Sequence, residues 1–188
     1  SQPEKITLRL ELAQSDTKID QTFIQMQEEG ATDDFDMSMD LTKIINKGSN
    51  IYTLVGTDRI QVAGNVLPLK ENTIPVGVDI ATTSEYTFRM PDGTAGMVVE
   101  LIDYETNTTT NLLLSDYAVT LQKGSCENRF VLHIQPEKSG VSTNIGQITG
   151  GDIDANSVQK YIIDGHLYLK KDGILYDAQG RQCTFHSR

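Results

Sequence analysis

The sequence has no tryptophan, few histidines and few basic residues, and each shortage narrows the function classes. Its 188 residues include no Trp, 3 His, and 16 Lys or Arg against 26 Asp or Glu, for a net charge of −10. This charge disfavours nucleic acid and anionic lipid surfaces as partners, because both attract a cationic protein face. The absence of Trp mildly disfavours a sugar-binding platform of stacked aromatic rings.

Long apolar runs are also lacking. None approaches the roughly 20 residues that a membrane-spanning helix needs, so we expect no membrane insertion. The first residues, Ser1–Glu4, show neither the basic nor the apolar stretch of a signal peptide. Because the chain begins with Ser rather than Met, we expect a processed or trimmed product.

Cysteine is scarce, since Cys126 and Cys183 are the two in the sequence. Two cysteines are too few for a disulfide-rich scaffold, and without closely spaced histidines they cannot form a four-ligand zinc site. Two readings stay open. The thiols are both free, or they form one disulfide that fastens the C-terminus to the main body and stabilises it by about 4 kcal/mol.

β-Branched residues are abundant, and 20 Thr, 17 Ile and 11 Val favour sheet over helix. Apolar and polar residues alternate strictly from Ile6 to Leu12, which predicts a half-buried strand. The same pattern recurs at 74–80, 86–90, 117–121 and 130–134, and shorter apolar runs at 51–55, 60–62, 97–102 and 112–114 predict further strands. Turn signals separate them at Asn65, Pro91-Asp92-Gly93, Thr106-Asn107 and Lys123-Gly124-Ser125. We therefore predict an all-β, antiparallel β-sandwich or barrel.

One stretch, Asp36–Lys47, has helical features, because Met37, Leu41 and Ile44 recur at helical spacing before Gly48. We expect one short helix or turn there.

The C-terminal part differs in composition. Residues 139–157 are rich in Gly, Ser, Thr and Asn, which predicts a linker or long loop after a sandwich domain at residues 1–138. Residues 158–188 repeat a short strand followed by Asp-Gly, which predicts a small β-meander. So small a unit is marginal alone, and we expect it to dock on the sandwich, on export machinery or on a second copy of the chain as a homo-oligomer.

Acidic residues cluster between positions 28 and 40, and hard cations take clustered carboxylates. The candidate calcium ligands are Asp33, Asp34, Asp36 and Asp40. The alternative is that these acids cap and stabilise the start of the short helix. A second segment, with Asp152, Asp154 and Asn156, matches the first half of a calcium-binding loop.

Catalytic motifs are not apparent. Nucleophilic catalysis needs a base near a Ser, Cys or Thr, and the three histidines are His133, His166 and His186. His133 lies in a predicted strand on the face opposite the apolar residues, so we expect it to face solvent. No phosphate-binding loop or nucleophile elbow occurs. We predict that the chain is not an enzyme and needs no cofactor.

Several segments, in order and spacing, resemble a region of large secreted and surface proteins of Bacteroidetes bacteria. They are Ile24-Gln25-Met26, residues 29–36, Asp40, Lys43, Ile51-Tyr52-Thr53-Leu54, Tyr86-Thr87-Phe88, residues 99–106, Asn111-Leu112, Asp116-Tyr117 and residues 129–133. In that family the region is a jelly-roll-like β-sandwich before a C-terminal tail that the type IX secretion system reads. Residues 164–169 and 172–181 resemble a short form of such a tail.

This resemblance implies a secreted or outer-membrane cell-surface location and a jelly-roll-like sandwich with a short C-terminal β-meander. It further implies a non-catalytic module that spaces, displays or attaches, with secretion or attachment machinery as a partner. The alternative is an adhesin or carbohydrate-binding module that contacts other surface proteins or glycans. Its candidate aromatic residues are Tyr52, Tyr86, Tyr104 and Tyr117.

Overall fold

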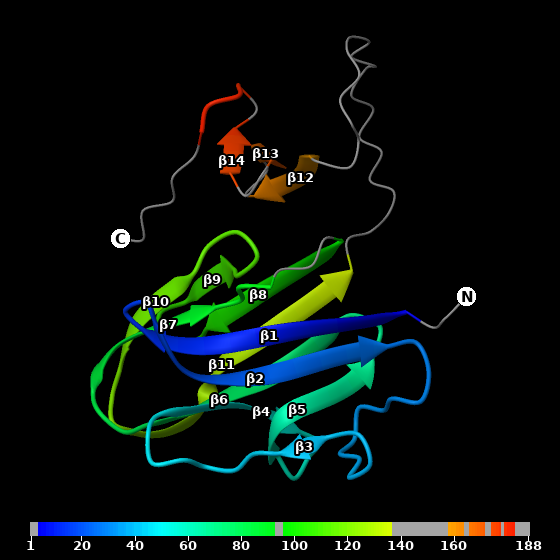
Figure 1. Ribbon diagram of the computed structural model, residues 1–188, viewed down its shortest axis with the longest axis vertical. Coiled ribbons are helices and arrows are strands. Elements are labelled where there is room, and N and C mark those ends of the chain that lie inside the picture. Colours follow the sequence, from blue (N-terminus) through cyan, green and yellow to red (C-terminus); the bar gives the residue numbers. More distant parts are fainter. Residues whose placement is uncertain are drawn as a thin grey trace. The chain divides into compact units, whose positions relative to one another are not determined.

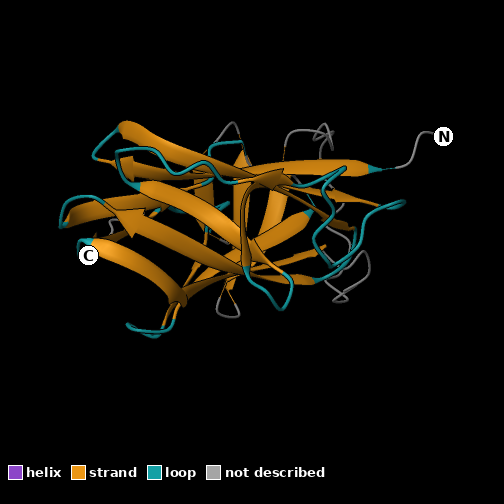
Figure 2. Ribbon diagram, turned by 90° about the horizontal axis from the view of Figure 1, so that it is seen from below, coloured by secondary structure: helices purple, strands orange, loops and turns teal. Residues whose placement is uncertain are grey.

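The computed structural model describes residues 4–92, 96–136, 158–163, 166–171, 174–177 and 179–182 (Figure 1). The chain divides into two compact units, Ser1–Glu137 and Lys138–Arg188, called unit 1 and unit 2 below. Strands and loops make up the described residues, and no helix lies among them (Figure 2). Among these residues no helix has the length and apolar character needed to cross a membrane. The prediction of an all-β chain is therefore confirmed.

Unit 1 holds the first eleven strands. They are β1 (Lys5–Gln14), β2 (Thr17–Gln27), β3 (Leu41–Thr42), β4 (Asn50–Val55), β5 (Ile60–Pro68), β6 (Asn72–Ile80), β7 (Ser84–Arg89), β8 (Met97–Asp103), β9 (Thr108–Asn111), β10 (Tyr117–Leu121) and β11 (Gly124–Pro136). They form one sheet in the order β10-β7-β1-β2-β5-β4-β6-β11-β8-β9, and β3 pairs with β5. Figure 1 shows β1 and β2 crossing in front of β6 and β11.

The sheet curls around a single core until it is nearly barrel-shaped. Alternate residues such as Leu8, Leu10 and Leu12 of β1 are fully buried, as the period-two pattern predicts. Core side chains come from nine of the strands, with β3 and β9 as the exceptions. Because one face of nearly every strand points to this core, the sheet has to close on itself rather than lie flat.

The two ends of the sheet order are held together by a cluster around Asp103. β9 and β10 are the terminal strands of the order, and residues 112–116 join them. The Tyr117 hydroxyl of β10 donates to Asp103 Oδ2 of β8 at 2.6 Å. Arg129 of β11 donates to both carboxylate oxygens of Asp103, from Nε at 2.8 Å and from Nη2 at 2.9 Å. Asp103 thus links three strands where the curled sheet closes.

One strand pair departs from the predicted antiparallel arrangement. β2 and β5 run parallel, with Phe23 opposite Gly64 and Gln27 opposite Pro68. The other pairs within the described residues are antiparallel. The parallel pair arises because the long connection after β2 leads to β4. The next strand, β5, then lies between β2 and β4 in the sheet. The alternation of apolar and polar residues within each strand does not reveal that β5 inserts between β2 and β4.

Of the short helix or turn predicted at Asp36–Lys47, the helix is wrong and a turn is present. The segment forms a turn, the short strand β3 and an irregular stretch. Met37 and Ile44 are 87% and 86% exposed, so their helical spacing buries nothing. The Asp40 carboxylate accepts hydrogen bonds from the backbone N–H groups of Asp36 and Val66 instead, which favours a loop anchored to β5.

Two further local predictions are wrong. Residues 112–114 form a turn, because the N–H groups of Leu114 and Ser115 donate to the Asn111 carbonyl. Asn65, predicted to mark a turn, lies inside β5 and is buried. Pairing with β2 outweighs the turn preference of Asn at this position.

Unit 2 contains β12 (Val158–Ile163), β13 (His166–Lys171) and β14 (Ile174–Asp177), which form a three-stranded antiparallel sheet. These strands follow the predicted meander. After β14 the Asp177 carboxylate accepts hydrogen bonds from the N–H groups of Gln179 and Arg181 and so holds a turn. The predicted linker, residues 139–157, and the Asp-Gly pairs between the strands lie outside the described residues.

Candidate functional site

The four predicted calcium ligands do not converge. Asp33 forms an ion pair with Lys70 at 2.7 Å, and Asp36 accepts hydrogen bonds from the hydroxyl and N–H of Ser38. These bonds, the hydroxyl first, lower the pKa of the Asp36 carboxyl. Asp40 is held by two backbone N–H groups, and Asp34 borders a groove.

Each of these aspartates therefore has its own surroundings, and the described residues contain no group of three or more ligands that could hold a metal ion. The alternative prediction, in which the acids cap a helix, fails with the helix itself. The calcium site stays a prediction. Lys70, which neutralises Asp33, lies in the turn before β6, and no spacing rule in the sequence connects the two.

The four candidate tyrosines do not form an aromatic face. Tyr52 and Tyr86 are buried, Tyr117 is half-buried, and Tyr104 is exposed. The Tyr52 hydroxyl donates to Glu127 Oε1, and burial together with this carboxylate raises the pKa of Tyr52. The Tyr86 hydroxyl donates to the Thr82 carbonyl. Because both rings are buried, neither is available to stack on a ligand.

The fold tests neither reading of the two cysteines. Cys126 is half-buried on β11, and burial raises the pKa of its thiol. Cys183 lies outside the described residues.

His133 is the one candidate histidine whose side chain is described. Its Nε2 lies 2.7 Å from Glu71 Oε1, and its Nδ1 lies 3.6 Å from Glu100 Oε2. It sits on the outer face of β11, as predicted, and links β11 to carboxylates beside β6 and on β8.

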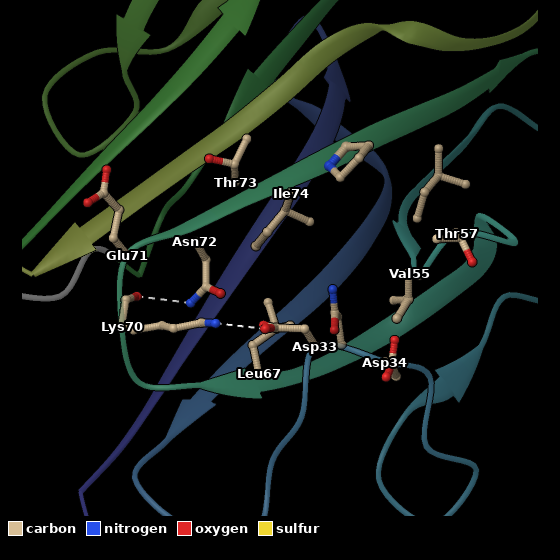
Figure 3. Close-up of a pocket in the computed structure, with 14 residues that line it drawn as sticks. Asp33, Asp34, Val55, Thr57, Leu67, Lys70, Glu71, Asn72, Thr73 and Ile74 are labelled. Carbon is tan, nitrogen blue, oxygen red and sulfur yellow. Dashed lines mark hydrogen bonds and ion pairs between the residues drawn. The ribbon is translucent and has the colours of Figure 1, made fainter.

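The strongest candidate for a binding site is a groove on unit 1 of about 450 Å³ (Figure 3). It forms where β4 ends at Val55. Beyond that point β5 and β6 separate, since β4 pairs with β5 over Ile60–Val62 and with β6 over Val76–Asp79. The groove is lined by residues 54–57, 72–75, Asp33, Asp34, Asn65, Leu67, Lys70 and Glu71.

Asn65 gives the groove an acceptor without a partner. Its side chain is 3% exposed, and its Oδ1 has no hydrogen-bond donor in the described structure. A buried amide oxygen without a hydrogen bond lowers the stability of the fold by about 1–3 kcal/mol. Its presence in a folded protein therefore calls for an explanation. Nearby Asn72 is satisfied, because its amide nitrogen donates to the carbonyls of Pro68 and Lys70.

A second hollow of about 290 Å³ adjoins the groove and shares Asp34, Val55, Gly56 and Thr57 with it. Phe35, Asp58 and Ile60 complete its lining. Across the two hollows the charged lining residues are Asp33, Asp34, Asp58 and Glu71 against Lys70. The site is therefore acidic with apolar walls. Sequence reasoning identified two of its acids but missed Asn65, because a buried Asn in a strand looks like a turn signal.

Comparison with known proteins assigns the chain to a family. Neither the curated proteins nor the solved structures include a match to this chain. The model of the family described as "Domain of unknown function (DUF8693)" matches residues 1–134, which span β1 to all but the end of β11. The chain belongs to this family.

Proposed function

We propose that the chain is a non-catalytic module of a secreted or outer-membrane cell-surface protein. Unit 1 spaces or displays, and unit 2 acts as an export or attachment signal that secretion machinery reads. The observation that carries the proposal is the division of the chain at Glu137, after which β12, β13 and β14 form a three-stranded sheet of their own. The resemblance to Bacteroidetes surface proteins supports the same assignment.

The charged groups buried in unit 1 fit a structural role. Glu11 is 4% exposed and pairs with Arg9 at 3.3 Å and with Arg89 at 2.7 Å. Asp20 pairs with Lys43 and also accepts the N–H of Ile51. Charges fixed in this way hold strands together, whereas a catalytic acid or base needs access to substrate.

We further propose that unit 1 is a jelly-roll-like variant of the β-sandwich. Tyr86, near the start of β7, donates to the carbonyl four residues upstream, which is the arrangement of a tyrosine corner in β-sandwich proteins. Its hydroxyl lies 3.0 Å from Ser49 Oγ, and Ser49 Oγ accepts the N–H of Ala81. These hydrogen bonds join the start of β7 to the segment before β4, which lies far from it in the sequence.

Localisation tests the proposal. The full chain and a version that ends at Glu137 would be expressed with a signal peptide in a Bacteroidetes host, and cell fractions would be compared. The truncated chain is expected to accumulate, folded, in the periplasm, whereas the full chain reaches the surface or the medium. Equal distribution of the two forms would contradict a sorting role for unit 2.

A binding module is the second candidate, favoured by the groove rather than by the tyrosines. The burial of Tyr52 and Tyr86 removes two rings from any sugar-stacking face. Recognition of other surface proteins through the groove and its loops is the form of this candidate that the geometry supports.

A further inference from the structure

One hydrogen-bond acceptor in the groove has no donor among the described residues. Asn65 Oδ1 is buried, has no donor and lines the groove. Natural interiors rarely leave such an oxygen unpaired, and those that do often sit at sites of function. A ligand that fills this site therefore brings an N–H or O–H group.

The charge of the two hollows selects a cation. Asp34 lines both of them, and Asp58 lines the second. Neither carboxylate has an ion-pair partner among the described residues. Arg59, next in sequence to Asp58, turns away and donates to the Glu127 carbonyl and to Asn128 Oδ1. Lys70 is already paired with Asp33.

The walls suit an aliphatic stem that ends in a cation. Val55, Leu67 and Ile74 border the larger groove, and the Phe35 ring borders the second hollow beside Asp34 and Asp58. An ammonium or guanidinium group gains both from carboxylates and from an aromatic face. Long basic side chains pack their methylene groups on apolar surface while the charged end meets an acid.

We propose that the two hollows form a docking site for a short basic segment of a partner polypeptide. A Lys or Arg side chain lies along Val55 with its cationic group at Asp34, and a donor of the same segment pairs with Asn65 Oδ1. The two hollows share a wall. A peptide can place one side chain in each hollow, so it fits them better than a linear amine does. This role goes beyond spacing or display and is independent of how the chain is exported.

Two other occupants fit less well. No aromatic ring lines the larger groove, so the stacking surface that sugars use is missing there. Addition of a strand along β6 is opposed by Pro75, which lines the groove and has no backbone N–H to donate.

Binding of a tetra-lysine peptide, blocked at both ends, tests the proposal by calorimetry and by amide NMR shifts on the full chain at low salt. We expect binding that weakens with added salt and shifts the resonances of Asn65, Thr57 and Thr73. The same peptide with every lysine acetylated keeps its stems but not its charge, and should not bind. Absence of tetra-lysine binding at millimolar concentration would overturn the proposal.

Three variants locate the site. Asp34→Asn removes one exposed charge that lines both hollows and should weaken binding by about threefold to tenfold. Asp16→Asn is the matched control, since it removes an exposed acid that lines neither hollow and should leave affinity unchanged. Asn65→Leu removes the unpaired oxygen and should raise the melting temperature while it weakens binding.

Equal weakening by Asp34→Asn and Asp16→Asn would reduce the effect to general charge attraction and contradict the site. If Asn65→Leu fails to fold, the comparison of the two aspartate variants still decides the matter. Spermine serves as a further arm. Binding of spermine at this site without binding of the peptide would assign the groove to free polyamines and overturn the peptide proposal.

Discussion

Asp103 has no exposed surface, and its contacts favour the charged form of its carboxyl. Burial alone would raise the pKa of its carboxyl. The hydrogen bonds from Arg129, Tyr117 and the Glu105 N–H, with the charge of Arg129, outweigh burial and lower the pKa to about 2. The same contacts raise the pKa of Arg129, and burial together with Asp103 raises that of Tyr117. A single carboxylate thus holds β8, β10 and β11 together where the curled sheet closes.

Replacing Asp103 by Asn should therefore be strongly destabilising. The Arg129 side chain, itself 12% exposed, would lose its buried counter-charge, at a cost of about 3 kcal/mol or more. Glu105→Gln is the control, because Glu105 contacts the same guanidinium at 3.1 Å from a side chain that is 70% exposed. Its loss should be no more than about 1 kcal/mol. Urea unfolding measures both, and equal losses would refute the role given to Asp103.

Stability should also fall in acid for the same reason. A carboxyl whose folded pKa is below its unfolded value of 3.8 contributes stability above that value and loses it as pH falls toward about 2. The unfolding free energy of the native chain should drop between pH 4 and pH 2. Asp103→Asn should show a shallower drop in that window, and identical slopes in urea titrations at each pH would contradict the assignment.

Residue patterns predicted burial better than they predicted partners. The alternation from Ile6 to Leu12 identified three core leucines, because the period of a strand follows from its backbone geometry. The partner of Asp103 could not be read in this way. Arg129 lies on another strand, and the pairing depends on the register of β8 with β11.

At the scale of elements, the β4–β6 pair contains a glycine that makes room for a tyrosine ring. Gly77 lies opposite Tyr52 in the β4–β6 pair, and a Cβ at position 77 would overlap the tyrosine ring. The ring therefore lies flat over the glycine, with its hydroxyl on Glu127 of β11. In the sequence, Gly77 lies between the apolar positions of the 74–80 alternation, and a glycine inside a strand often marks such a close approach.

Gly77→Ala should destabilise unit 1 by about 1–3 kcal/mol, because the ring has to move off its site. The double change Gly77→Ala with Tyr52→Ala should cost less than the sum of the single changes, since removal of the ring relieves the overlap. Thermal or urea unfolding of the four proteins supplies the cycle. Additive losses would mean that the contact is unimportant.

The loop between β2 and β4 also allows an element-scale prediction about calcium. Asp33, Asp36 and Asp40 already have Lys70, Ser38 and backbone N–H groups as partners. We therefore expect the same melting temperature in chelator and in millimolar calcium. A higher melting temperature in calcium, which binding to the folded state would produce by mass action, would support the predicted metal site.

The strands that show a local alternation of apolar and polar residues were predicted. The features that depend on long connections between strands were missed. The strands of the five alternating segments are present, whereas the helical spacing at Asp36–Lys47 misled because nothing packs against it. The parallel pair of β2 and β5 and the separation of β5 from β6 arise from chain crossings. The groove follows from that separation, so neither its shape nor Asn65 could be inferred from periodicity.

At the scale of the whole molecule, the chain is a large curled sheet followed by a small separate one. The family match ends at residue 134, close to the end of unit 1 at Glu137. This agreement supports a module with its own core. We infer that the tail can be moved to another protein without loss of its role.

Transfer of unit 2 to a reporter tests whether this unit carries an export or attachment signal. Residues 138–188 would be fused behind a folded reporter that carries a signal peptide, and surface exposure would be measured by protease treatment of intact Bacteroidetes cells. The fused reporter is expected to become protease-accessible, whereas the reporter without the tail stays protected in the periplasm. Protection of both forms would contradict the assignment of unit 2 as an export or attachment signal.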